Sequence, residues 1–174
     1  ETTAQRLQSW LRDLSDYFIR LPADEIDAGI EEGLREIIEF LDVDRSTLFE
    51  FVGDDLSLSA IHSCTRPGIE AFRSGPFRDA LPWYHDQLAH GQTVILERLP
   101  DDLPAEAVQE RRYIEQVGIR ANLTIPILVG GRPTCVLAVG SFREHRTWPV
   151  EVIDRLQIAG EILAAALPRS RASR

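Results

Sequence analysis

Residues 119–142, IRANLTIPILVGGRPTCVLAVGSF, contain two apolar, β-branched runs on either side of Gly130 and Gly131. Glycine tolerates the positive φ that both central positions of a tight hairpin turn require. Two β-branched runs joined by such a pair are typical of two antiparallel strands. The stretch therefore predicts a β-hairpin, and the rest of the chain is interpreted around it.

Side chains alternate between the two faces of a strand, and this alternation separates polar from apolar positions in the hairpin. On its first strand, Asn122 and Thr124 lie opposite the aliphatic residues. On its second strand, Ser141 lies opposite the small residues that end in Gly140. We expect the polar side chains to face a pocket. The opposite face should lie beneath helices, with a helix approaching closely at Gly140.

Length and composition bound the function. A chain of 174 residues fits one domain. Its formal net charge of −9 argues against direct nucleic-acid binding, because phosphate contacts need clustered cations. No apolar run approaches the ~20 residues of a membrane span and no signal peptide is visible, so we expect a cytoplasmic protein. Methionine is absent even at position 1, which suggests a piece of a longer protein.

Two amphipathic helices are predicted at the ends of the chain. Residues 2–21 carry an apolar seam at spacings of four and three, and residues 149–167 repeat that spacing. The first seam suits either packing on its own domain or a dimer contact. We expect residues 1–21 to form a dimerising helix and 22–167 the main domain, with helix 149–167 shared in a homodimer. Residues 168–174 should be a linker or a frayed tail.

The middle of the chain predicts short elements around a long loop. A second helix follows Pro22 and covers the sheet. Strands are expected at 45–52 and 56–64 around a turn at 53–55, and a third at 93–96. The loop spans 65–82. Short helices are expected at 81–90 and 105–117; in the second, the charged residues from Glu110 to Glu115 are expected on a solvated face.

Aromatic and polar side chains beside the loop are the candidate pocket lining. Trp83 and Tyr84 lie on the first short helix and Tyr113 on the second, although Trp83 also suits a role as an anchor for the loop. His62 and Cys64 share a face at the end of a strand. An H-x-C pair contains metal-ligand types, but two ligands do not make a metal site, and an ordinary strand end has the same pattern.

The order of these elements resembles the GAF family of sensory domains over residues 14–167. The resemblance rests on VDRSTLFE at 43–50, LPAE at 103–106, VGIR at 117–120, IPI at 125–127 with GGR at 130–132, and RTWP at 146–149. It looks like the branch attached to bacterial sensor histidine kinases and transcription regulators. The resemblance implies an α+β, PAS/profilin-like fold with an antiparallel sheet. The terminal helices would cover one face, and a small-molecule pocket under the loop and short helices the other.

The family's known ligand motifs do not identify a cofactor. Cyclic-nucleotide-binding relatives carry an Asn-Lys-Phe-Asp-Glu signature, and this chain has no lysine. Bilin-binding relatives attach the chromophore through a cysteine, whereas the short helix here has His85 and His90 without one. Iron-binding relatives use His, Cys and Asp where this chain has Arg120, Asn122 and Ser141. The cofactor therefore stays unknown.

These observations predict a non-enzymatic domain that senses an unidentified small molecule and signals through its terminal helices. No catalytic or metal-binding residue is assigned. The candidate ligand-binding residues are His62, Cys64, Trp83, Tyr84, Tyr113, Asn122, Thr124 and Ser141. The alternative is a thiol-based redox sensor or GAF-fold reductase that uses Cys64 or Cys135. Those two cysteines show neither a disulfide framework nor zinc spacing.

Overall fold

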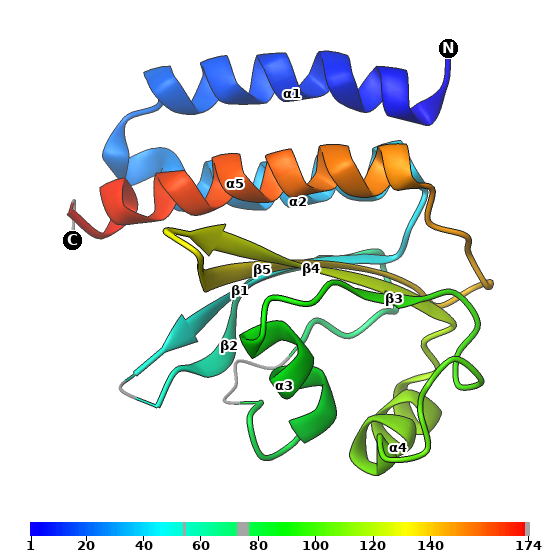
Figure 1. Ribbon diagram of the computed structural model, residues 1–174. Coiled ribbons are helices and arrows are strands. Elements are labelled where there is room, and N and C mark those ends of the chain that lie inside the picture. Colours follow the sequence, from blue (N-terminus) through cyan, green and yellow to red (C-terminus); the bar gives the residue numbers. More distant parts are fainter. Residues whose placement is uncertain (54, 73–76, 173–174) are drawn as a thin grey trace.

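The described residues form a five-stranded antiparallel sheet with helices on both faces (Figure 1). The structure is a computed structural model and describes residues 1–53, 55–72 and 77–172. The strands are β1 Arg45–Val52, β2 Ser57–Thr65, β3 Val94–Leu96, β4 Ala121–Val129 and β5 Arg132–Ser141, in the order β2-β1-β5-β4-β3 across the sheet. The predicted α+β fold and its antiparallel sheet are confirmed. Parts of the predicted turn 53–55, loop 65–82 and tail 168–174 lie outside the described residues.

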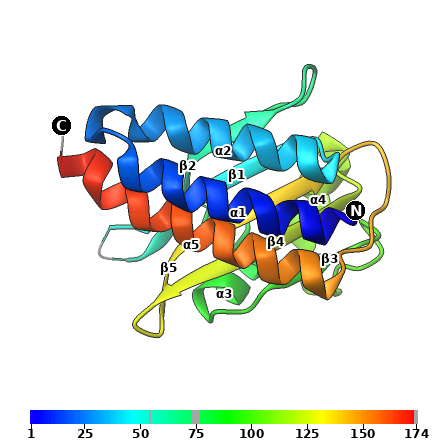
Figure 2. The same ribbon diagram turned by 90° about the horizontal axis from the view of Figure 1, so that it is seen from above.

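One face of the sheet carries two layers of helix. Helices α2, Ile26–Leu41, and α5, Val150–Ala172, pack on the strands, and a short 3-10 helix, Ala23–Glu25, precedes α2. Helix α1, Thr3–Arg20, lies over the seam between α2 and α5, as Figures 1 and 2 show from two directions. A capping box between Thr2 and Gln5 begins α1. The apolar seam of α1 therefore packs within its own domain.

The other face of the sheet carries the short helices α3, Pro82–Ala89, and α4, Val108–Val117, together with the loops around them (Figure 1). Proline at the first position begins α3, and Gly118, at φ 80°, ends α4. A second apolar cluster fills this side, separate from the cluster under α2 and α5. The sheet thus has a helix-covered face and a face closed by α3 and α4.

The assignment of faces on β5 was wrong. In the hairpin register, Asn122 pairs with Gly140 and Thr124 with Ala138, and paired residues share a face. Gly140 therefore lies on the side of α3 and α4, where an added Cβ would be 3.0 Å from Cδ1 of Ile119 rather than near a helix. Ser141 lies on the helix-covered face and is fully buried. Both faces of β5 are apolar, so alternation alone groups its side chains without showing which group faces which layer.

The close approach of helix to sheet occurs at Gly160 of α5. A Cβ built there would lie 2.5 Å from Cδ1 of Ile127 and 3.5 Å from Cβ of Leu137. Since real Cβ atoms do not approach that closely, only glycine allows α5 to rest on the hairpin at this depth. The hairpin is therefore in contact with the terminal helix through a position that the sequence pattern did not single out.

The end of α5 is ordered where a linker or frayed tail was expected. The helix runs through Pro168 to Ala172. The Arg169 guanidinium donates to the carbonyl oxygens of Phe18 and Leu21, both at 2.6 Å. The Ser170 hydroxyl donates to the Asp27 carboxylate at 2.8 Å. These contacts attach the last turn of α5 to the C-terminal end of α1 and to the start of α2.

Candidate ligand-binding site

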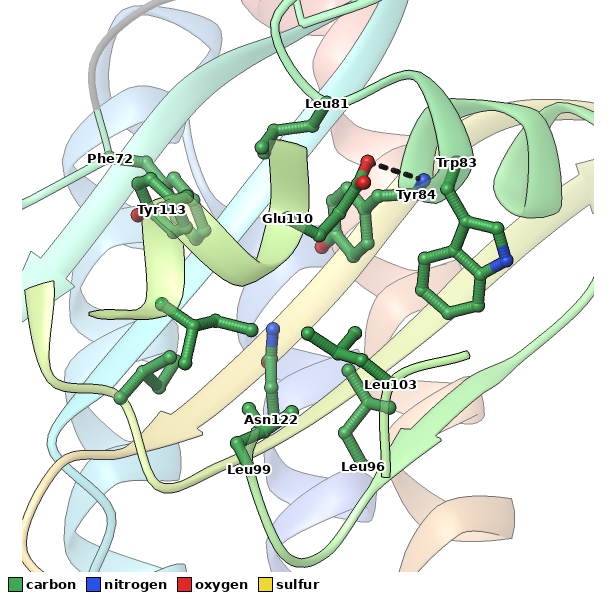
Figure 3. Close-up of a pocket in the computed structure, with 12 residues that line it drawn as sticks. Phe72, Leu81, Trp83, Tyr84, Leu96, Leu99, Leu103, Glu110, Tyr113 and Asn122 are labelled. Atoms are coloured by element: carbon green, nitrogen blue, oxygen red, sulfur yellow. Dashed lines mark hydrogen bonds between the residues drawn. The ribbon is translucent and has the colours of Figure 1, made fainter. Parts of the chain in front are cut away.

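A small cavity lies between the sheet and helices α3 and α4 (Figure 3). Its volume is about 30 Å³, which accommodates about two water molecules. The lining consists of Phe72, Leu81, Trp83, Tyr84, Leu96, Leu99, Leu103, Glu110, Tyr113, Ile114, Ile119 and Asn122. Most of these side chains are apolar or aromatic, and a few polar groups converge among them. That composition is typical of small-molecule sites, although such sites usually measure 300–1,000 Å³.

Tyr84 connects α3 to the sheet. Its ring is buried, and its hydroxyl lies 2.8 Å from Oγ1 of Thr124 on β4. Burial raises the pKa of Tyr84, and the Thr124 hydroxyl opposes that rise only in part. The phenol therefore stays neutral and can donate or accept a hydrogen bond. Thr124 thus contributes to the site by holding Tyr84 in place.

Glu110 on α4 places a carboxylate inside this largely apolar cavity. The side chain is 4% exposed, and Oε2 accepts a hydrogen bond from the Tyr84 backbone N–H at 3.1 Å (Figure 3). Oε1 is buried and has no hydrogen-bond partner among the described residues. A buried carboxylate oxygen without a donor is costly. Glu110 therefore lines the cavity with a carboxylate oxygen that no described donor satisfies.

Glu110 was expected on a solvated face, and that expectation was wrong. The residue lies three positions before Tyr113 and four before Ile114, so all three share one face of α4. The helical spacing was the signal that could have found it. Because Tyr113 was already expected to line the pocket, the same spacing points Glu110 inward.

A wider groove adjoins the cavity. Three residues, Phe72, Leu81 and Tyr113, line both the groove and the cavity. Its volume is about 530 Å³. The rings of Phe72 and Tyr113 stack with centroids 5.8 Å apart and planes at 10°. Arg45 of β1 also lines this groove with a side chain that is 2% exposed. Sequence reasoning assigned Arg45 no role in the site.

Four of the eight predicted site residues line the cavity: Trp83, Tyr84, Tyr113 and Asn122. Thr124 contacts the site through Tyr84, as described above. Ser141 lies on the opposite face of the sheet, and its hydroxyl has no partner among the described residues. The hairpin register puts Ser141 opposite Ala121 and so turns it away from the pocket.

His62 and Cys64 also lie away from the cavity, on the side of β2 that faces α2. The His62 ring nitrogens are 3.1 Å from Asp27 Oδ1 and 3.4 Å from Glu31 Oε1. The Cys64 thiol donates to the Glu31 carbonyl oxygen at 3.3 Å. Within the described part of the chain, no cluster of three or more metal-ligand side chains is present. His62 and Cys64 therefore connect β2 to α2.

The environment of the two cysteines disfavours thiol chemistry. Burial raises the pKa of the Cys64 thiol. Burial, and then the neighbouring Glu50, raises the pKa of Cys135 to about 11. Reactive cysteines have lowered pKa values, because the thiolate is the nucleophile. Cys135 is also buried in the core beneath the helices.

Comparison with known proteins identifies the family. Residues 25–167 match the GAF domain family. The chain belongs to the GAF family. A search of curated proteins found no sequence match. In the part of the chain that the structure describes, no helix is long and apolar enough to cross a membrane.

Several solved structures share the fold of this chain. The phycoerythrobilin-bound GAF domain from a cyanobacterial phytochrome has a TM-score of 0.73 and 17% identity, over 97% of this chain and 97% of its own. The free methionine-R-sulfoxide reductase from Neisseria meningitidis has a TM-score of 0.70 and 14% identity, over 100% of this chain and 95% of its own. A GAF domain from Synechocystis has a TM-score of 0.62 and 19% identity, over 85% and 95%. At these identities the similarity shows the fold alone.

Proposed function

We propose that this GAF domain is a non-enzymatic sensor that binds a small molecule between the sheet and helices α3 and α4. The observation that supports it is the buried Oε1 of Glu110, an acceptor without a donor, in a cavity lined by Trp83, Tyr84 and Tyr113. A ligand that offers a hydrogen-bond donor would satisfy that oxygen, and the aromatic rings would cover its apolar part.

Binding requires the site to open. The closed cavity of about 30 Å³ is far below the usual ~300–1,000 Å³ of small-molecule sites, so α3 and α4 must separate to admit a ligand between them. The hydrogen bond from Tyr84 N–H to Glu110 holds the two helices together in the closed form. A ligand that fits only between the separated helices would bias the domain towards an open form, which is the kind of two-state change that a sensor needs.

The ligand is expected to be smaller than the bilins named for similar structures. The family resemblance implies covalent bilin attachment through a cysteine near α3, and residues 82–90 contain none. Thiol chemistry is not favoured either, because the pKa values of both cysteines are raised.

The finer proposal is that the domain belongs to a cytoplasmic bacterial signalling protein, a sensor kinase or transcription regulator, and acts as a homodimer. Ile19 of α1 and Ile158 of α5 are 73% and 42% exposed, and they flank a groove between the two helices. A second copy that packs its own Ile19 and Ile158 there would cover this apolar surface. A shift of α5 against α1 would then transmit a conformational change at the pocket to the dimer interface.

The ligand proposal is tested with Glu110→Gln. The amide keeps the shape of the side chain and removes its charge. Native mass spectrometry of the purified chain should show a copurifying small molecule that the variant retains about tenfold less or worse, since hydrogen bonds to charged groups contribute about 1.5–3 kcal/mol. Glu115→Gln, exposed on the same helix, is the matched control and should retain the molecule. Equal retention by Glu110→Gln, or an empty unmodified chain, would contradict the proposal.

A further inference from the structure

Arg45 is a buried cation with an unused donor. It is the first residue of β1, pairs with Gly140 of β5, and therefore points to the face that carries α3 and α4. Its Nη1 donates to the Glu70 carbonyl oxygen at 3.2 Å. Its Nη2 is buried without a hydrogen-bond partner, and Arg45 makes no ion pair within the described residues.

The residues around Arg45 are aromatic rather than acidic. The guanidinium carbon lies 3.6 Å from the centroid of the Phe72 ring and 4.9 Å from that of Phe142. The adjacent Asp44 points to the other side, where its carboxylate accepts from Arg143 Nε at 2.8 Å and from the Phe142 backbone N–H at 2.6 Å. The nearest acid in sequence is therefore already engaged by a different arginine.

Burial lowers the pKa of Arg45, and the neighbouring Tyr113 hydroxyl opposes that change in part, but a guanidinium does not lose its proton in a protein. The charge therefore stays in the site, where ring faces offset only part of its desolvation. An anion that accepts from Nη2 would supply the missing partner, and guanidinium–carboxylate hydrogen bonds are among the strongest that proteins make.

The groove beside Arg45 has room for the rest of such a ligand. Its volume of about 530 Å³ lies within the usual range for small-molecule sites. The stacked pair Phe72 and Tyr113 forms a wall that continues into the cavity of Glu110. The exposed carboxylate of Glu70 and the exposed guanidinium of Arg112 share the groove with Arg45, so its described lining carries one net positive charge and suits a monoanion better than a dianion such as a phosphate monoester. These features select a singly charged anion with an apolar or aromatic body.

We infer that Arg45 anchors the carboxylate of a small aromatic monocarboxylate. The aromatic body lies along Phe72 and Tyr113, and its far end is directed towards the free oxygen of Glu110. The inference rests on the proposed function, since it names the class of ligand for the same site. It adds that the ligand carries a negative charge at one end and that Arg45 binds that charge.

Paired probes test the anion directly. Indole-3-acetate and phenylacetate are each compared with their neutral amides, indole-3-acetamide and phenylacetamide. Binding to the unmodified chain is followed by NMR shifts of backbone amides around the site and of the Arg45 guanidinium N–H groups. The carboxylates should bind at least about tenfold more tightly than the amides. The Arg45 side-chain signals should move only with the carboxylates. These measurements on the unmodified chain do not depend on a variant that folds.

Two variants complete the test. Arg45→Gln should remove the preference for carboxylate over amide, with Arg45→Lys restoring part of it. Arg112→Gln changes an exposed arginine of the same groove and should leave the preference intact. Loss of the preference in Arg112→Gln, with unmoved Arg45 signals, would assign the effect to surface charge and overturn the inference.

The outcomes separate the inference from the proposed function. If the amides bind as tightly as the carboxylates, the site takes small molecules and only the role of Arg45 fails. If no member of either pair shifts the site, and no molecule copurifies with the chain, both fail together.

Discussion

Gly160 is the residue on which the contact between α5 and the hairpin depends. An added Cβ would lie 2.5 Å from Cδ1 and 3.1 Å from Cγ1 of Ile127, which is 1% exposed, so the Ile127 side chain would have to shift within a filled core. Gly160→Ala should therefore destabilise the fold by about 1–3 kcal/mol in urea unfolding, despite the better helix propensity of alanine.

Gly33 of α2 provides the matched comparison. A Cβ there meets Cδ2 of Leu163 at 3.4 Å, which is an ordinary contact. Gly33→Ala should leave stability unchanged or raise it by up to about 1 kcal/mol. A Gly160→Ala variant as stable as Gly33→Ala would show that α5 is less closely packed than the structure indicates.

His85 makes stability depend on pH. Its ring is buried beside Phe51, and Nε2 donates to the Leu56 carbonyl oxygen at 3.2 Å. Burial, and then the charge of Arg78, lower the pKa of His85. The hydrogen bond to the Leu56 carbonyl oxygen, and then the nearby Asp86 and Asp55, oppose that change only in part.

The sign of the effect follows from proton binding. Below the ordinary histidine pKa of about 6.5, the unfolded chain binds a proton that the native His85 does not, so stability falls as pH falls from about 6.5. Urea unfolding at pH 7.5, 6.5 and 5.5 should show this decline, and His85→Leu should reduce it. His90→Leu, exposed at the end of α3, is the control. Asp42 and Asp55 have lowered pKa values, so their contribution to stability is lost only below about pH 4, outside the range of this experiment. An unchanged slope in His85→Leu would contradict the assignment.

At the scale of elements, the last turn of α5 fastens α1 to the domain. Arg169 caps the carbonyl oxygens of Phe18 and Leu21 at the end of α1. Arg169→Ala should reduce stability by about 1 kcal/mol and speed amide hydrogen exchange in the last turns of α1 and α5. Arg12→Ala, exposed on α1, should change neither. Unaltered exchange in Arg169→Ala would mean that packing alone holds the two helix ends together.

At the scale of the whole molecule, the two apolar sides of α1 serve different purposes. Leu7 and Leu14 lie on the buried side of α1 and are 1% and 4% exposed. Replacing either with glutamate should therefore unfold the domain, at a cost of at least about 3 kcal/mol. Ile19 and Ile158 point outward. Replacing both with glutamate should change stability by only about 0.5 kcal/mol and convert a homodimer to a monomer in light scattering. A chain that is monomeric before mutation, well above micromolar concentration, would refute the dimer proposal.

The sequence by itself determined the kinds of elements and much of their extent. β1 begins and ends where predicted, and the Gly130–Gly131 hairpin formed as expected. Helix α4 begins at Val108, three residues after the predicted 105, and α5 extends five residues past the predicted 167. Helical and strand periods depend on neighbours within one element, which is why local patterns were sufficient for these features.

Only the tertiary structure decided which face of β5 meets the pocket and which charged side chains are buried. Both faces of β5 are apolar, so its orientation comes from pairing with β4 and β1. Arg45 is enclosed by Phe72 and Phe142, which are distant in sequence, and Glu110 by α3 and the sheet. A charged side chain looks the same in sequence whether it is solvated or buried. Its burial depends on elements that fold over it from elsewhere in the chain.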